Sequence, residues 1–211
     1  MQMFTIRREQ GRLAEVAPLL KRFVDDHPGD TVWLPGLMLI WSDLGFQAQA
    51  RESLRQMEQS ELAIPMDSKR LITLTYFAEV AARLGESAPA ARIYDLLLPF
   101  RDQAVTVPVF TLCCGSAARY LGMLVSALGD WTAAEQYFEY ALQMDTHLQA
   151  WPWLAHSQHE FAVMLAARNR AEDRSRAAQL LAAAAEAAKR LGMCALLERI
   201  SGVPAINEHR S

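Results

Sequence analysis

A glycine that recurs between two helix-like apolar patterns constrains the fold of this chain most strongly. Gly11, Gly45, Gly85 and Gly129 stand in similar short phrases, at successive spacings of 34, 40 and 44 residues. Periods of this length indicate an array of helical hairpins, in which each pair of helices packs against its neighbours. Longer connections between hairpins explain the second and third spacings.

The clearest unit is Gly115–Leu142. Its first helix carries Leu121 and Gly122, and its second helix carries Ala134 and Phe138. The small residues Gly122 and Ala134 would let two antiparallel backbones approach each other, with Phe138 filling the adjacent space. A glycine between the two helices supplies the positive φ of a tight turn. This arrangement resembles the tetratricopeptide repeat (TPR), whose pattern places Leu-Gly in the first helix and Ala-x3-Phe in the second.

The N-terminal and central connections follow this pattern less closely. Around Gly11 the chain is expected to begin with a hairpin whose first helix is short or absent, and Pro28 closes the unit. No strand pattern competes with the helices. The alternating stretch Val105–Phe110 contains Pro108, so we expect an extended connection there rather than a strand. The next helix is expected to begin at Cys113.

A closing pair of helices is expected near the C-terminus. A helix begins near Pro152, and an alanine-rich helix follows over Ser175–Leu191, stopped by Gly192. A short helix over Met193–Ile200 ends the array. We therefore predict an all-α fold, a TPR-like, right-handed α-solenoid of antiparallel hairpins with about nine or ten helices. One repeat domain should span residues 1–201, followed by a flexible tail over residues 202–211.

The composition is that of a folded chain with a hydrophobic core, since 52% of the 211 residues are hydrophobic and 21% are charged. The net charge of −3 provides no electrostatic footprint for nucleic acid. The longest apolar run, Val32–Trp41, is half the length of about 20 residues that a membrane-spanning helix needs. The N-terminus lacks a signal-peptide pattern, and three cysteines do not make a disulfide framework. We expect a cytoplasmic protein that binds neither nucleic acid nor membranes.

Four phrases carry a further resemblance, namely Arg8–Leu13, Leu97–Phe100, Gly115–Gly122 and Pro152–His156. Together they resemble the C-terminal TPR region of large bacterial signalling proteins, which join an AAA-type ATPase to a cyclase, kinase or DNA-binding module. The resemblance spans nearly the whole chain and implies a sensor or adaptor arm. It implies no ATPase activity, because none of the three lysines follows a glycine as a phosphate-binding P-loop requires.

The first helix of each hairpin in such an array lines the concave face. On this basis eight side chains are candidates for contact with a partner. They are Asp43, Thr75, Glu79, Arg83, Arg119, Met123, His156 and His159. Their mixed character suits a peptide groove, and a merely solvated wall would have the same composition. No catalytic residue, cofactor or metal ligand is assigned.

His156, His159 and Glu160 share one helix face, which raises the alternative of a metal site. The order His-x-x-His-Glu is not a zincin motif, and no further ligand is evident, so we expect a polar groove face instead. The three cysteines have no nearby base or metal partner and are interpreted as packing residues.

These observations favour a non-catalytic scaffold that binds a protein or a peptide. The alternative is a groove that forms a small-molecule-binding or catalytic pocket. A buried His or Glu with a strongly shifted pKa in a closed cavity would favour that alternative. A third hypothesis is a homodimer formed through an exposed terminal hairpin, Leu13–Val24.

Overall fold

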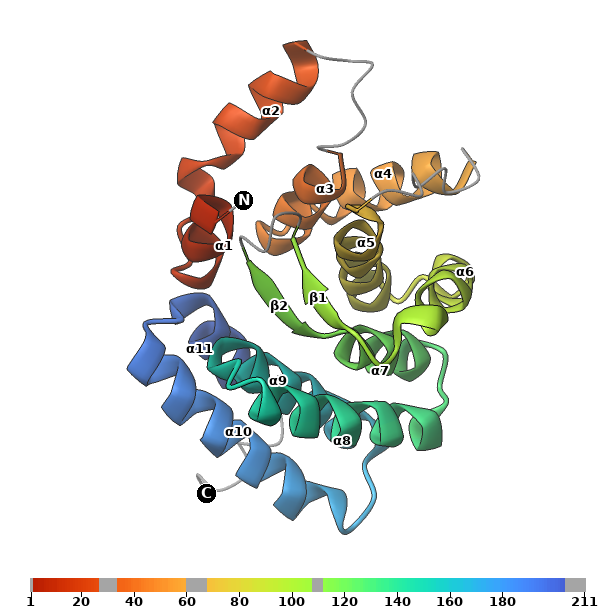
Figure 1. Ribbon diagram of the computed structural model, residues 1–211, viewed down its shortest axis with the longest axis vertical. Coiled ribbons are helices and arrows are strands. Elements are labelled where there is room, and N and C mark those ends of the chain that lie inside the picture. Colours follow the sequence, from red (N-terminus) through yellow and green to blue (C-terminus); the bar gives the residue numbers. More distant parts are fainter. Residues whose placement is uncertain (1, 27–33, 60–67, 108–111, 204–211) are drawn as a thin grey trace.

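The protein is represented by a computed structural model that describes residues 2–26, 34–59, 68–107 and 112–203 (Figure 1). It is mostly helical, with 79% of these described residues in α-helices and short 3₁₀ segments. The α-helices are α1 (Gln2–Glu9), α2 (Ala17–Asp26), α3 (Leu34–Asp43), α4 (Gln47–Gln59), α5 (Arg70–Leu84), α6 (Ser87–Leu97), α7 (Ala117–Ala127), α8 (Trp131–His147), α9 (Trp151–Arg168), α10 (Asp173–Leu191) and α11 (Cys194–Ser201). The predicted helical class is confirmed. The described residues contain eleven α-helices where about nine or ten were expected.

Each of the four recurring glycines lies in a turn between helices, with φ between 68° and 82°. Gly85 ends α5, and its backbone N–H donates to the carbonyls of Ala81 and Ala82. Glycine adopts this left-handed conformation without the steric cost that a Cβ imposes. The predicted stop at Gly192 is confirmed, since this residue ends α10 with φ of 69°. Asn169 ends α9 in the same conformation.

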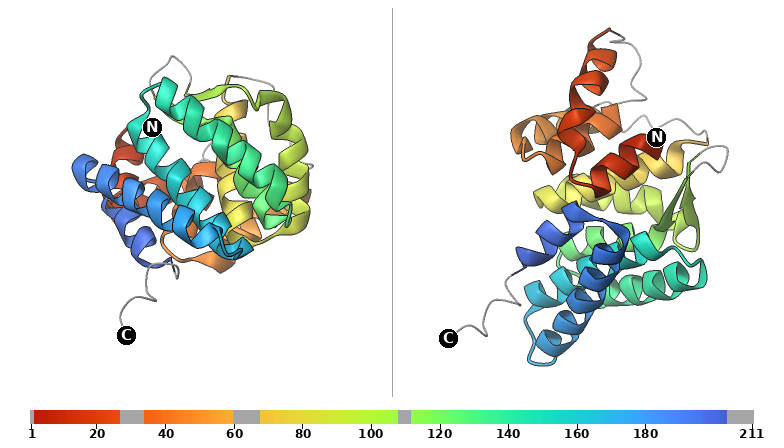
Figure 2. Two further views of the ribbon diagram at one scale, coloured as in Figure 1. Left: turned by 90° about the horizontal axis from the view of Figure 1, so that it is seen from below. Right: turned by 90° about the vertical axis from the view of Figure 1, so that its left-hand side faces the viewer.

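The helices form consecutive pairs that pack side by side. α3, α5, α7 and α9 contact one another in series, and α4, α6, α8 and α10 each pack against the helix that precedes them. The two ends of the chain also meet, because α1 contacts α11 (Figures 1 and 2). The N-terminal helix is therefore positioned against helices that lie far from it in the sequence.

The predicted close contact between α7 and α8 is confirmed. Gly122 packs directly against the ring of Phe138, and Ala134 is fully buried. Phe138 in turn stacks on Phe161 of α9, with ring centroids 5.5 Å apart. This core joins three successive helices and fixes their spacing.

An extended connection rather than a strand was expected over Val105–Phe110, but the first part of this stretch belongs to a strand, and residues 108–110 lie outside the described residues. Strand β1 (Ala104–Thr106) pairs antiparallel with β2 (Cys113–Ser116), and Ala104 lies opposite Ser116. The helix begins at residue 117 rather than at Cys113, because the Ser116 hydroxyl accepts a hydrogen bond from the Ala118 backbone N–H and caps the helix. Val105 is fully buried, so the short hairpin also covers the core.

The N-terminal part of the chain begins with the short helix that was expected. It leads through the 3₁₀ segment η1 (Leu13–Glu15) into α2, where Leu19 is 67% exposed. Dimerisation through this hairpin stays a prediction. Pro28 and residues 204–211 of the expected tail lie outside the described residues. Among the described helices, none is long and apolar enough to span a lipid bilayer.

Candidate functional site

Charged side chains from both ends of the chain meet those of the central helices in two groups of ion pairs and hydrogen bonds, which the neighbouring residues Arg8 and Glu9 of α1 bring side by side. We call the two groups together the ionic network. The network consists of Arg8, Glu9, Asp43, Glu79, Arg83, His156, His159, Glu160 and Arg199. α1 and α11 supply three of these residues, and α3, α5 and α9 supply six. We call the side of α3, α5 and α9 that carries those six residues the inner face. Charged groups removed from solvent are stable only when they are paired, which explains the density of contacts.

Two carboxylates on the inner face share two arginines. Arg8 places its Nε 2.5 Å from Asp43 Oδ2 and its Nη1 3.2 Å from Glu79 Oε2. Arg83 donates to Asp43 at 2.5 Å and also contacts Glu79. Burial acts to raise the pKa of Glu79, but the charges of Arg8 and Arg83 outweigh it and hold the pKa well below its ordinary value. The pair therefore stays ionised and binds guanidinium groups.

His156 connects the two terminal helices. Its Nε2 lies 2.9 Å from Glu9 Oε2, and its Nδ1 lies 2.9 Å from Arg199 Nη2. An arginine can only donate, so Nδ1 accepts and the proton of a neutral ring sits on Nε2, from which it is donated to Glu9. Burial lowers the pKa of His156, and the nearby Arg199 lowers it further, while Glu9 acts in the opposite direction. The side chain is 4% exposed.

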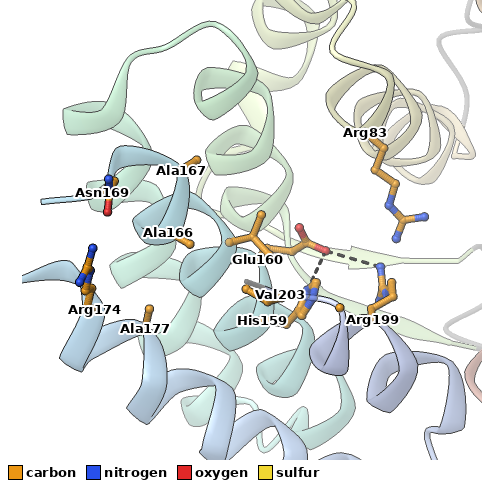
Figure 3. Close-up of a pocket in the computed structure, with 12 residues that line it drawn as sticks. Arg83, His159, Glu160, Ala166, Ala167, Asn169, Arg174, Ala177, Arg199 and Val203 are labelled. Carbon is orange, nitrogen blue, oxygen red and sulfur yellow. Dashed lines mark hydrogen bonds and ion pairs between the residues drawn. The ribbon is translucent and has the colours of Figure 1, made fainter. Parts of the chain in front are cut away.

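Glu160 forms the other branch of the network (Figure 3). Its Oε1 lies 3.3 Å from His159 Nδ1 and 3.6 Å from Arg199 Nη1. Burial acts to raise the pKa of Glu160, but His159 and Arg199 outweigh it and keep the pKa far below its usual range. Arg199 thus holds one histidine and one carboxylate on α9.

A cavity of about 680 Å³ opens beside this branch, between α5, α9, α10 and α11 (Figure 3). Arg83, Glu160 and Arg199 stand at one end, and Asn169 and Arg174 stand at the other. Small apolar side chains of α9 and α10 line the space between them. The volume lies in the range of about 300–1,000 Å³ that is usual for ligand sites.

A second cavity, of about 510 Å³, lies next to α1 and α11. Arg8, Glu9, Asp43, His156 and Arg199 contribute to its wall. The ionic network is therefore not sealed in the core, since its residues line two cavities.

The structure brings five of the eight predicted groove residues together, namely Asp43, Glu79, Arg83, His156 and His159. Their role in binding stays a prediction. Met123 is separate from the network and lines a smaller cavity of about 290 Å³, which Arg83 and Glu160 also border.

Thr75 and Arg119 lie in the interior and line none of the described cavities. Thr75 is fully buried, and its hydroxyl donates to the Ile72 carbonyl at 2.7 Å. The Arg119 guanidinium is 4.1 Å from the centre of the Tyr120 ring and 5.4 Å from that of Trp153. These aromatic contacts make Arg119 a cation–π partner in the packing between α7 and α9, and its role in binding stays a prediction.

Arg8, Glu9 and Arg199 are the network residues that sequence reasoning missed as site residues. They come from the two ends of the chain, and a repeat pattern specifies only contacts between neighbouring units. Nothing in the sequence indicated that α1 would reach α11.

The three cysteines and the histidine pair have simple structural descriptions. Cys114 is buried, whereas Cys113 and Cys194 are exposed, so the interpretation of all three as packing residues was too broad. His156 and His159 turn to different carboxylates. In the part of the chain that the structure describes, no three His, Cys, Asp or Glu side chains are grouped to hold a metal ion.

No protein-family model, curated protein sequence or solved structure matches this chain. The class of this protein is therefore described from its own fold and site. It is a mostly helical protein in which the central helices and the two terminal helices share one ionic network with a ligand-sized cavity beside it.

Proposed function

We propose that the protein is a TPR-like α-solenoid that serves as a non-catalytic scaffold for a protein or peptide partner. Two features support the repeat assignment. The recurring glycines lie in turns between successive helices, and alternate helices contact one another in series. Such stacking of helical pairs builds the extended binding surfaces of repeat proteins.

One observation carries the functional part of the proposal, the position of the ionic network beside the 680 Å³ cavity. Asp43, Arg83 and His159 come from three different helices and belong to the same network. The cavity offers an apolar space for an anchoring side chain, and the charged groups at its end can orient the rest of a partner. Residues held on packed helices keep this geometry without a cost of ordering on binding.

The sequence resemblance supplies the biological setting of the proposal. The scaffold would act as the sensor or adaptor arm of a bacterial signalling system, in the cytoplasm, and its partner would be another protein of that system. A direct measurement of binding tests the proposal without any assumption about that partner.

The test is a selection of peptides from a displayed library on the immobilised full chain, followed by measurement of Kd for the selected peptides. Val163 is 37% exposed and borders the 680 Å³ cavity. Val163→Glu should weaken binding at least about tenfold, because it places a charge in the apolar space. Leu148→Glu is the matched control, since Leu148 is 42% exposed at the end of α8 and borders none of the described cavities. Equal loss of binding in both variants, or in neither, would contradict the proposal.

The volume of the same cavity supports the alternative of a small-molecule site. In that case a drug-sized compound, rather than a peptide, would raise Tm, and Val163→Glu would remove the increase. Binding is favoured over catalysis because Glu9, Glu79 and Glu160 are each paired with a basic group of the same chain. A catalytic base has to reach a proton of the substrate, and these three carboxylates are instead held by basic groups of the protein.

A further inference from the structure

The N-terminal helix lies against the inner face in the way that a peptide ligand would. None of its residues is fully buried, and its contacts with the inner face come from individual side chains. The ring of Phe4 packs edge-on against Tyr76 of α5, with ring centroids 6.4 Å apart. One helical turn later Arg8 reaches Asp43, and Glu9 binds His156.

The position taken by Arg8 is selective for a guanidinium group. Arg8 presents two nitrogens to Asp43, with Nε at 2.5 Å from Oδ2 and Nη2 at 3.3 Å from Oδ1, and it also donates to Glu79. This fork matches the geometry of a carboxylate, which the single ammonium of lysine cannot do. Without Arg8, two largely buried carboxylates would face Arg83 as their main counter-charge. An unbalanced buried carboxylate is costly, so the empty site would attract another cation.

The aromatic contact adds a second element of recognition. Tyr76 is 9% exposed and belongs to the hydrophobic core, and Phe4 covers the outer part of its ring. A ligand that carried an arginine alone would leave this part of Tyr76 in water. An aromatic residue one helical turn before the arginine satisfies both contacts.

We propose that Asp43, Glu79, Tyr76 and His156 form a recognition site for a partner segment with the pattern aromatic-x-x-x-Arg-Glu, and that α1 is its occupant within the chain. This inference rests on the proposed scaffold function and names the chemistry of its partner. A partner segment binds in place of α1. The observed affinity is therefore lower than the intrinsic affinity by the fraction of molecules in which α1 has left the site.

The experiment uses the full chain and a fluorescent peptide with the sequence of residues 2–12. Arg8→Ala should weaken the hold of α1, so the variant should bind the peptide at least about tenfold more tightly than the unsubstituted chain. A peptide with alanine at the position of Arg8 should not bind, and Asp43→Asn added to Arg8→Ala should remove the gain. Arg7→Ala is the matched control, because Arg7 pairs with Gln10 and with Glu15 of η1 rather than with the inner face.

Phe4→Ala provides a second way to release α1, since it leaves every charge of the network unchanged. Circular dichroism identifies folded variants. The inference is overturned if both folded variants bind the peptide no better than the unsubstituted chain, or if the gain survives Asp43→Asn. If the inference is overturned but the peptides selected from the library still lose affinity for the Val163→Glu variant, the proposed scaffold function remains supported. The absence of such peptides as well would end both proposals.

Discussion

A Cβ added to Gly122 would lie 3.1 Å from three carbons of the Phe138 ring. Ordinary contact between carbon atoms is about 3.5–4.0 Å, so α7 and α8 are as close here as a residue without a side chain allows. The Phe138 ring cannot readily move away, because it is also stacked on Phe161. The spacing of the two helices therefore depends on this glycine.

Gly122→Val should lower the free energy of unfolding by about 1–3 kcal/mol, the usual cost of overpacking a core. Urea denaturation at constant pH measures the change. Gly36→Ala is the control, since no atom lies within 4 Å of an added Cβ in α3. That substitution should raise the stability by up to about 1 kcal/mol through helix propensity alone. A Gly122→Val protein as stable as the unsubstituted one would show that α7 and α8 can separate freely.

The Gly122–Phe138 contact was predictable because it is local. Both residues belong to one hairpin, and a pattern of small and aromatic residues over about 20 positions specifies how its two helices meet. The same reasoning located the turn at Gly129 and the stop at Gly192. It also placed Asp43 and Glu79 among the candidate groove residues, because their positions within the repeat indicate which way they face.

Two parts of the structure, the strand β2 and the contact between the chain ends, could not be predicted from the repeat pattern. The strand β2 depends on Gly115, where a Cβ would lie 2.6 Å from the Cβ of Trp153, a residue of another hairpin. The site depends on Arg8 of α1 and Arg199 of α11, which both reach the inner face because the two ends of the chain come together there. Contacts between such distant residues have no signature in a single sequence, because periodicity reports which residues share a face and not which faces meet.

Asp145 of α8 connects this helix to β2 and α9, and its replacement should lower the free energy of unfolding. It is fully buried and accepts hydrogen bonds from the Ser116 backbone N–H at 2.8 Å and from the Ser157 hydroxyl at 2.7 Å. Asp145→Ala would leave both donors without a partner, at about 1–3 kcal/mol each. Asp145→Asn keeps one acceptor oxygen and should lose less. Equal stabilities of the two variants in urea denaturation would contradict a role for these hydrogen bonds.

The three cysteines should react with thiol reagents at different rates, because one is buried and two are exposed. Burial raises the pKa of Cys114 to about 12, whereas Cys113 and Cys194 are exposed. Thiol reagents attack the thiolate, so Ellman's reagent should titrate two thiols in the folded protein and the third only after unfolding. Cys113→Ala should reduce the rapid count to one, and Cys114→Ala should leave it at two. Three rapid thiols in the folded protein would show that the β1–β2 hairpin opens easily.

The neutral state of His156 should make stability depend on pH. The groups that face its ring are Glu9 from α1, Arg199 from α11 and Arg119 from α7, and burial together with the arginines lowers its pKa. An exposed histidine titrates near pH 6.5. As the pH falls below that value, the unfolded chain binds a proton that the folded protein does not, so the free energy of unfolding decreases.

His156→Gln should reduce this loss of stability between about pH 7.5 and pH 5.5, because glutamine stays neutral. Its amide N–H can donate to Glu9 and its carbonyl can accept from Arg199, so the contacts of the neutral ring are kept at the higher pH. Urea denaturation at both pH values gives the difference. His147→Gln is the control, since His147 is exposed at the end of α8 and lies outside the ionic network. An unchanged pH dependence in His156→Gln would mean that the pKa of His156 is the same in the folded and the unfolded chain, which would contradict the buried neutral ring.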